Sequence, residues 1–267
     1  MLWEELNSHD FAECVKRANG TCVIPLGVVE KHGPHLPVGT DVFVVREVAA
    51  MAARIEPVVI FPWYYAGQIS EARHVPGTIS YSPELQWKML EETCAEISRN
   101  GFDKIVIMNG HGGNNDMIGY FCQCSLHTPK DYVLYNIRAF WDGDNHRQMV
   151  ELLGDENLGG HAGNMETAMV MALLPETVHM EYAEKEDCEP TARLKSIAGV
   201  SAPIEWYADY PNHYAGSPLA ATAAVGKKMY EALADDTARI FAEIKNSKAL
   251  AVQNEYFEIC NNRNRNQ

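Results

Sequence analysis

A loop near the start of the chain combines carboxylate and imidazole side chains at a spacing that suits metal binding. Glu30 and His32 follow the apolar run 22–26, and Asp41 comes nine residues after His32. Side chains two positions apart in an extended segment point the same way, so Glu30 and His32 can converge on one point. Mixed carboxylate and imidazole ligands suit zinc, manganese or iron. The alternative, a polar loop in which Asp41 caps the following helix, stays open on these residues alone.

A second cluster follows the apolar run 105–108, and its residues 109–114 are Asn-Gly-His-Gly-Gly-Asn. Glycines let a ligand approach the backbone closely, and the following helix offers free N–H groups. No Lys-Ser or Lys-Thr pair follows, so a P-loop is not expected. Open α/β sheets bind ligands at the carboxyl ends of their strands. We therefore expect His111 to be a site residue rather than a buried structural histidine, with Gly112 and Gly113 in contact with substrate.

A third cluster, residues 159–167, combines His161 and Glu166 with three glycines. Glu166 falls in the first turn of a predicted helix, where the helix dipole favours a carboxylate with or without a metal. The flexible flanks of His161 offer it no rigid packing partners, so we expect it to transfer protons or to polarise substrate. Both residues are therefore candidate catalytic groups, and Glu166 is also a candidate metal ligand.

Together the clusters place six candidate groups at strand ends or helix starts: Glu30, His32, Asp41, His111, His161 and Glu166. This set is too large for one closed structural zinc and large enough for two metals that share a carboxylate. The sequence therefore predicts two divalent metal ions, with zinc, manganese and iron as the alternatives. His74, near the end of the second predicted strand, is expected either to contact substrate or to lie on the surface.

Short β-branched runs alternate with amphipathic stretches along the chain. Strands are predicted at 22–26, 57–61, 104–108 and 132–137, and helices at 41–55, 83–100, 114–126 and 163–174. This rhythm predicts an α/β fold with a mainly parallel sheet and helices on both faces.

The same pattern predicts a single domain over residues 1–267. The segment 182–214 holds prolines and several aromatic residues, and we expect it to be a long loop excursion that serves as a lid or a subunit contact. The alanine-rich stretch 219–248 is predicted to form a long closing helix.

Composition excludes several classes of protein. The 267 residues carry a net charge of −14, which argues against binding to nucleic acid or to an anionic membrane. Seven cysteines without paired spacing indicate a reducing, cytoplasmic environment. Neither a signal peptide nor a membrane span is expected, because the N-terminal region has acidic residues at Glu4 and Glu5, no basic head and no long apolar run.

These motifs resemble the creatininase family of metal-dependent amidohydrolases. The matching stretches are residues 25–41, 76–80, 109–114, 160–167 and 216–222, within a likeness that covers about residues 2–230. The resemblance implies a three-layer α/β/α sandwich, commonly assembled as a homohexamer, with a two-metal site in each subunit. It also implies that Glu30 and His111 hold one metal, that His32 holds the other, and that Asp41 bridges them.

Two departures from the family pattern bear on the substrate. Creatinine-hydrolysing members carry a glutamate where this chain has Gly113, so the second metal lacks a carboxylate unless Glu166 supplies it. Those members also use a tryptophan just before the position of His161, whereas residues 156–158 are Glu-Asn-Leu here. We therefore expect a hydrolase that acts on a C–N bond, an amide or cyclic amide, of a small molecule other than creatinine.

Other substrates and one other class of protein stay open. The candidates include a formamide on a pyrimidine ribotide, the terminal amide of a short peptide, and an oxidised sugar, inositol or lactone. A neutral substrate is favoured because the basic residues near the motifs are few: Lys31, Arg46, Arg73 and Arg138. A non-catalytic metal-binding homologue would explain the missing carboxylate at Gly113.

Overall fold

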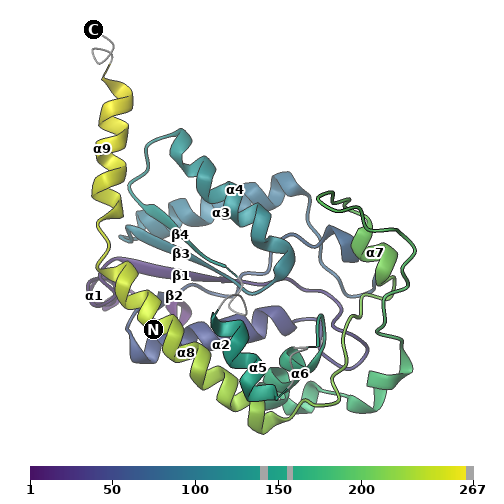
Figure 1. Cartoon of the computed structure of the whole chain (residues 1–267). Helices are drawn as coiled ribbons and strands as arrows, with labels where there is room; N and C mark the ends of the chain where they lie inside the picture. The colour runs from purple at the N-terminus through teal and green to yellow at the C-terminus, as the bar shows by residue number, and fades with distance from the viewer. Residues whose placement is uncertain (139–143, 155–158, 263–267) are drawn as a thin grey trace.

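The computed structural model describes residues 1–138, 144–154 and 159–262. The described residues form one parallel sheet of four strands in the order β2-β1-β3-β4 (Figure 1). The strands are β1 (Thr21–Leu26), β2 (Val59–Ile60), β3 (Lys104–Asn109) and β4 (Val133–Ile137). Leu26 lies opposite Asn109, so the two central strands end at the same edge of the sheet.

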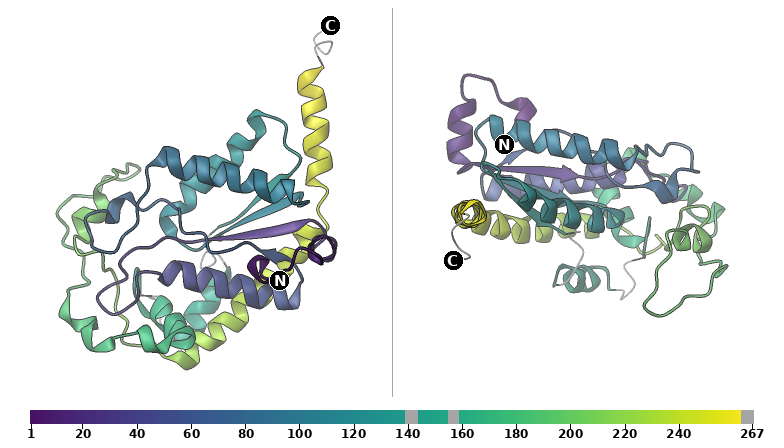
Figure 2. Two further views of the ribbon diagram at one scale, coloured as in Figure 1. Left: turned by 180° about the vertical axis from the view of Figure 1, so that it is seen from behind. Right: turned by 90° about the horizontal axis from the view of Figure 1, so that it is seen from above.

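Helices cover both faces of the sheet (Figures 1 and 2). One face packs against α2 (Thr40–Ile55), α6 (Asn164–Leu173) and α8 (Ala223–Lys245), with α5 (Asp144–Leu153) beside α8. The other face packs against α3 (Pro83–Arg99) and α4 (Asn115–Cys124). Alternation along β1 and β3 explains both cores, because Val23 and Val106 face the first while Ile24 and Ile105 face the second. The predicted three-layer α/β/α fold is confirmed.

Local sequence sets where the two long helices begin. Ser82 caps α3 by accepting a hydrogen bond from the backbone N–H of Leu85, and Pro83 occupies the first helical position. Thr222 caps α8 in the same way, so the closing helix predicted over 219–248 begins only at Ala223; it ends at Lys245. The chain then continues into α9 (Ala249–Asn261), which projects from the body of the molecule (Figure 1).

The start of α2 settles one alternative from the sequence. The helix begins at Thr40 after Gly39, so Asp41 is not its N-cap. The side chain of Asp41 is buried and points instead toward two histidines from other loops. The interpretation of Asp41 as a capping residue is therefore wrong.

The segment 182–214 is largely irregular and contains α7 (Glu205–Asp209). Figure 1 shows it on the side of the molecule away from α9. Its beginning is held by an ion pair between Lys31 and Glu186, and its end by a hydrogen bond from the Tyr214 hydroxyl to the Ala183 carbonyl, 3.2 Å. A role as a lid or subunit contact stays a prediction, as does the single domain.

The remaining elements are short. They are the helix α1 (Phe11–Arg17) and the 3-10 turns Trp3–Glu5, Ser70–Ala72, Gly112–Asn114, Ser125–His127, Pro175–Thr177 and Met180–Lys185. Within the described ranges, no helix has both the length and the apolar character needed to cross a membrane. All seven cysteines lie in the described ranges and are free thiols. Burial raises the pKa of the Cys22 and Cys94 thiols, which makes them unreactive.

Candidate metal centre

Three of the predicted ligands meet at the common end of β1 and β3. Glu30 follows β1, His111 follows β3, and Asp41 lies in the first turn of α2. Nδ1 of His111 is 2.8 Å from Oε1 of Glu30 and 3.1 Å from Oδ2 of Asp41. All three side chains are buried. Because neighbouring parallel strands end together, residues 81 positions apart in the sequence become neighbours here.

A second group lies on the other side of Asp41. Nε2 of His32 is 3.1 Å from Oδ1 of Asp41 and 3.8 Å from Oε1 of Glu166. The ring of His161 lies 4.3 Å from the ring of His32, measured between centroids. The two oxygens of Asp41 therefore face two different histidines, and every predicted metal ligand belongs to one of the two groups.

The donor set fits divalent cations. Oε1 of Glu30, Oδ2 of Asp41 and Nε2 of His111 are buried without a hydrogen-bond partner among the described residues. Buried polar atoms are normally satisfied, so two carboxylate oxygens that converge on Nδ1 of His111 without a well-formed hydrogen bond indicate a site for a positive ligand. Carboxylate and imidazole donors in this number suit zinc, manganese or iron.

The pKa values of the clustered side chains also support a site for cations. Burial disfavours a charged His32, but the carboxylates of Asp41 and Glu166 outweigh it and raise the pKa of His32 to about 10. Burial likewise opposes charge on His111, yet Glu30 and Asp41 hold the pKa of His111 well above its usual range. For Glu30 itself, burial opposes the charged form, but His111 beside it helps to keep the pKa of that carboxyl well below its usual range. The site attracts positive charge, which metal ions would supply.

His161 and Glu166 have different electrostatic surroundings. Burial lowers the pKa of His161 to about 3, against the opposing effect of Glu30, so its imidazole is neutral. Nε2 of His161 lies 2.7 Å from the carbonyl oxygen of Lys31, which can only accept, so Nε2 carries the hydrogen and Nδ1 keeps the lone pair. Burial raises the pKa of Glu166 to about 7, with His32 opposing. Oε2 of Glu166 accepts a hydrogen bond from the backbone N–H of Ala162, 2.6 Å.

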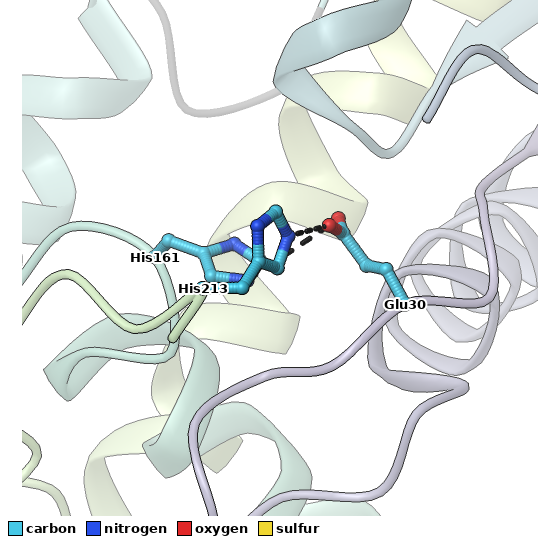
Figure 3. Close-up of side chains that lie close together, drawn as sticks. All are labelled: Glu30, His161 and His213. Carbon is cyan, nitrogen blue, oxygen red and sulfur yellow. Dashed lines mark hydrogen bonds and ion pairs between the residues drawn. The ribbon is translucent and has the colours of Figure 1, made fainter. Parts of the chain in front are cut away.

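Two site residues, His213 and Trp206, were missed by the sequence reasoning. His213 is buried, and its Nε2 donates to Oε2 of Glu30, as Figure 3 shows. Trp206, on α7, donates its indole N–H to Nδ1 of His213, 2.8 Å, and its ring lies 5.8 Å from the ring of His161. Trp206 thus lies beside His161 although it is distant in the sequence. The positions just before His161 where related proteins carry a tryptophan, 156–158, lie outside the described residues. No strand end or glycine motif marks this part of the sequence.

Close backbone packing brings these segments together. The N–H of Ala215 donates to the carbonyl of His161, 3.1 Å. A Cβ on Gly160 would lie 2.0 Å from the carbonyl oxygen of Ala215, so only glycine permits this approach. Ala162 and His213 adopt positive φ angles of 63° and 55°. Non-glycine residues in that region are uncommon and cluster at functional sites.

The predicted substrate contacts occupy different positions. A Cβ on Gly113 would lie 2.6 Å from Nε2 of His111 and 3.0 Å from Oε1 of Glu71, whereas one on Gly112 would meet nothing within 4 Å. His74 stays outside the two metal-ligand groups, with Nε2 2.8 Å from the carbonyl oxygen of Pro211. It lines an open pocket of about 1080 Å³ together with Glu71, Arg73, Trp206, Tyr207 and Tyr210.

A family model described as creatinine amidohydrolase, or creatininase, matches residues 4–241 of this chain. The chain belongs to the creatininase family. Its relatives include a 3-dehydro-scyllo-inosose hydrolase of Thermotoga maritima, 27% identical over 83% of this chain and 76% of that protein. A mycofactocin precursor peptide peptidase of Mycobacterium tuberculosis is 30% identical over 81% of this chain and 82% of that protein. The creatinine amidohydrolase of Pseudomonas putida is 26% identical over 61% of this chain and 69% of that protein.

Solved creatininase structures share the fold. A crystal structure of creatinine amidohydrolase matches with a TM-score of 0.74 and 20% sequence identity, covering 91% of this chain and 96% of that one. A manganese creatininase matches with a TM-score of 0.72, 20% identity and coverage of 91% and 97%. The protein is therefore a creatininase-family hydrolase whose buried His, Glu and Asp clusters resemble a binuclear site.

Proposed function

We propose that the protein is a binuclear metal-dependent amidohydrolase that cleaves a C–N bond, an amide or cyclic amide, of a small molecule other than creatinine. The position of Asp41 carries this proposal. One of its oxygens lies 3.1 Å from His32 and the other 3.1 Å from His111, as a carboxylate shared between two cations requires.

The ligands divide between two cations around Asp41. Glu30 and His111 would hold one, and His32 and Glu166 would hold the other. Gly113 offers no carboxylate, and the 3.8 Å approach of Glu166 to His32 supports Glu166 as its substitute. Zinc, manganese and iron all accept such ligands, so the pair is proposed as Zn, Mn or Fe.

The residues of the chain then have separate tasks. When bound, two divalent cations supply an activated water and polarise a carbonyl oxygen. His161 is proposed to pass a proton to the leaving nitrogen through Nδ1, because its Nε2–H is donated to the carbonyl oxygen of Lys31. Glu166 is proposed both as a ligand and as a proton acceptor beside His32. No nucleophilic side chain is needed.

The substrate is proposed to be small and without a phosphate. Two of the basic residues near the motifs are already engaged, because Lys31 pairs with Glu186 and Arg46 with Glu4. Gly112 and Gly113 are proposed to line the approach to the metals. His74 is proposed as a substrate contact from the 1080 Å³ pocket. A homohexamer in the cytoplasm is the expected assembly and location.

A second candidate substrate is an oxidised inositol or sugar, or a lactone. It is favoured by the Thermotoga maritima relative named as a 3-dehydro-scyllo-inosose hydrolase, which aligns over 83% of this chain. The amide proposal has comparable support from the relatives named as an amidohydrolase and a peptidase. A non-catalytic homologue would need the metal ligands to have lost their function.

One experiment separates these possibilities. The metal-free protein is reconstituted with Zn²⁺, Mn²⁺ or Fe²⁺, its metal content is measured, and it is assayed against a panel of amides, cyclic amides, lactones and oxidised inositols. Two metals per chain with turnover of an amide is the expected result. Turnover of lactones or inositols alone would favour the second candidate. Fewer than about one metal per chain would contradict a mechanism that needs two.

A further inference from the structure

The two carboxylate oxygens of Glu30 have different surroundings. Oε1 faces His111 and, within the described part of the chain, has no hydrogen-bond partner. Oε2 is hydrogen-bonded to Nε2 of His213, and Figure 3 shows His213 and His161 approaching the carboxylate from the same side. Oε2 is therefore held in place by His213, whereas Oε1 is the oxygen turned toward the other proposed ligand, His111.

Trp206 determines which nitrogen of His213 carries the hydrogen. An indole N–H can only donate, and Nε1 of Trp206 lies 2.8 Å from Nδ1 of His213. Nδ1 must then hold the lone pair, so Nε2 carries the hydrogen and donates it to Glu30. Glu30, His161 and His213 lie close enough together to form a ligand group. In this tautomer, however, His213 has no lone pair at Nε2 to offer a metal.

We infer that Trp206 and His213 are positioning residues that hold Glu30 so that it binds its cation through Oε1. The inference deepens the proposed function and rests on the proposed metal centre. Ligating carboxylates are commonly fixed by outer hydrogen bonds, whose loss lowers metal affinity about 10- to 100-fold. His213 supplies this bond to Glu30, and Trp206 fixes the ring of His213.

The backbone of α7 and the turn that follows it place Trp206 and His213 side by side. Trp206 lies on α7, and the N–H of His213 donates to the carbonyl of Tyr210, 2.9 Å, in the turn that follows. His213 keeps a positive φ of 55° and is only 2% exposed. Trp206 also lines the 1080 Å³ pocket, so a ligand bound there would touch the indole that holds His213.

Three variants and a matched control test the inference on the full chain. Trp206→Phe removes the indole N–H and keeps a ring, His213→Leu removes both nitrogens, and His213→Gln keeps an N–H donor for Glu30. Trp87→Phe is the control, because Trp87 packs against Phe121 on the opposite face of the sheet. Zn²⁺ affinity is measured by competition with a chelator.

Trp206→Phe and His213→Leu are expected to weaken Zn²⁺ binding about 10- to 100-fold, with a smaller loss in His213→Gln. Trp87→Phe should match the wild type. If the wild type binds two Zn²⁺ and both Trp206→Phe and His213→Leu bind them with the same affinity, the positioning role is overturned while the metal centre stands. A wild type that binds no Zn²⁺ would overturn the metal centre itself, so the two failures are distinguishable.

Nitrogen-15 NMR reports the tautomer of each histidine ring. If Trp206 only supported the fold, its replacement would not change the tautomer of His213. In the wild type, His213 is expected as the Nε2–H tautomer both without metal and with Zn²⁺. In Trp206→Phe the same ring should show a mixture of tautomers. A Zn²⁺-bound shift at Nε2 of His213 would make this residue a ligand and overturn its assignment as a positioning residue.

Discussion

Oε1 of Glu166 lies 3.8 Å from Nε2 of His32, so the start of α6 brings a carboxylate to the imidazole that Asp41 also faces. If Glu166 replaces the carboxylate missing at Gly113, Glu166→Gln should lower the metal content from two ions per chain to about one. Elemental analysis of reconstituted protein measures this. Glu176→Gln, at an exposed position of the same region, is the control. Two retained metals in Glu166→Gln would leave Glu166 with a proton-transfer role only.

Asp41→Ala should lose both metals together, because each of its oxygens faces a different group. Asp41→Asn keeps the shape of the side chain and tests the same point without a cavity. Asp116→Asn is the matched control, since Asp116 is an exposed acid in the first turn of another helix. Full metal occupancy in both Asp41 variants would exclude a bridging role.

His161→Ala should keep two metals and lose about 100- to 10,000-fold in turnover, the usual contribution of a positioned acid or base. The variant is assayed with whichever substrate the panel identifies, and its metal content is measured in parallel. The exposed His179→Ala provides the comparison. Loss of a metal from His161→Ala would show that His161 is a ligand.

Gly113→Ala should displace His111, because the new methyl group would lie 2.6 Å from Nε2 of His111. We expect a fall in Zn²⁺ affinity of about 10- to 100-fold, as for other disturbances of a ligand's surroundings. Gly112→Ala meets nothing within 4 Å and should bind Zn²⁺ like the wild type. Circular dichroism confirms that both variants are folded. Equal affinities would mean that His111 is not a ligand or that its ring can move freely.

Metal removal should lower the stability of the fold, because a cation that binds the assembled ligands and not the unfolded chain stabilises the folded state. Zn²⁺ at 100 times its Kd stabilises a one-site protein by about 2.7 kcal/mol. For a chain of this size that corresponds to a rise in Tm of roughly 5 to 10 °C. Thermal unfolding of chelator-treated protein with and without Zn²⁺ measures the shift. Mg²⁺ serves as a control, since imidazole ligands suit it poorly.

Much of the scaffold was predictable because its signals are local. The buried strand β3 contains the apolar run 105–108, and Ser82-Pro83 marks the start of a helix directly. The helix α9 was missed because its break from α8 depends on capping around Asn246, whose side chain bonds back to the Ala242 carbonyl.

Some residues of the candidate site could be predicted from the sequence, and others could not. Glu30 and His111 follow the ends of neighbouring strands, so the sheet brings them together, and Asp41 joins them from the first turn of the helix after β1. His213 and Trp206 lie in an irregular segment whose path depends on contacts with residues far away in the chain. Propensity and periodicity contain no information about such a path.

The wall of the open pocket and the metal ligands belong to different stretches of chain. Residues 202–210 contribute much of the wall, whereas the candidate ligands come from the ends of β1 and β3 and the starts of α2 and α6. Evolution could therefore reshape substrate preference by replacing one surface segment while the scaffold stayed intact. Such a graft would have to retain Trp206 and His213, because through them the segment also steadies Glu30.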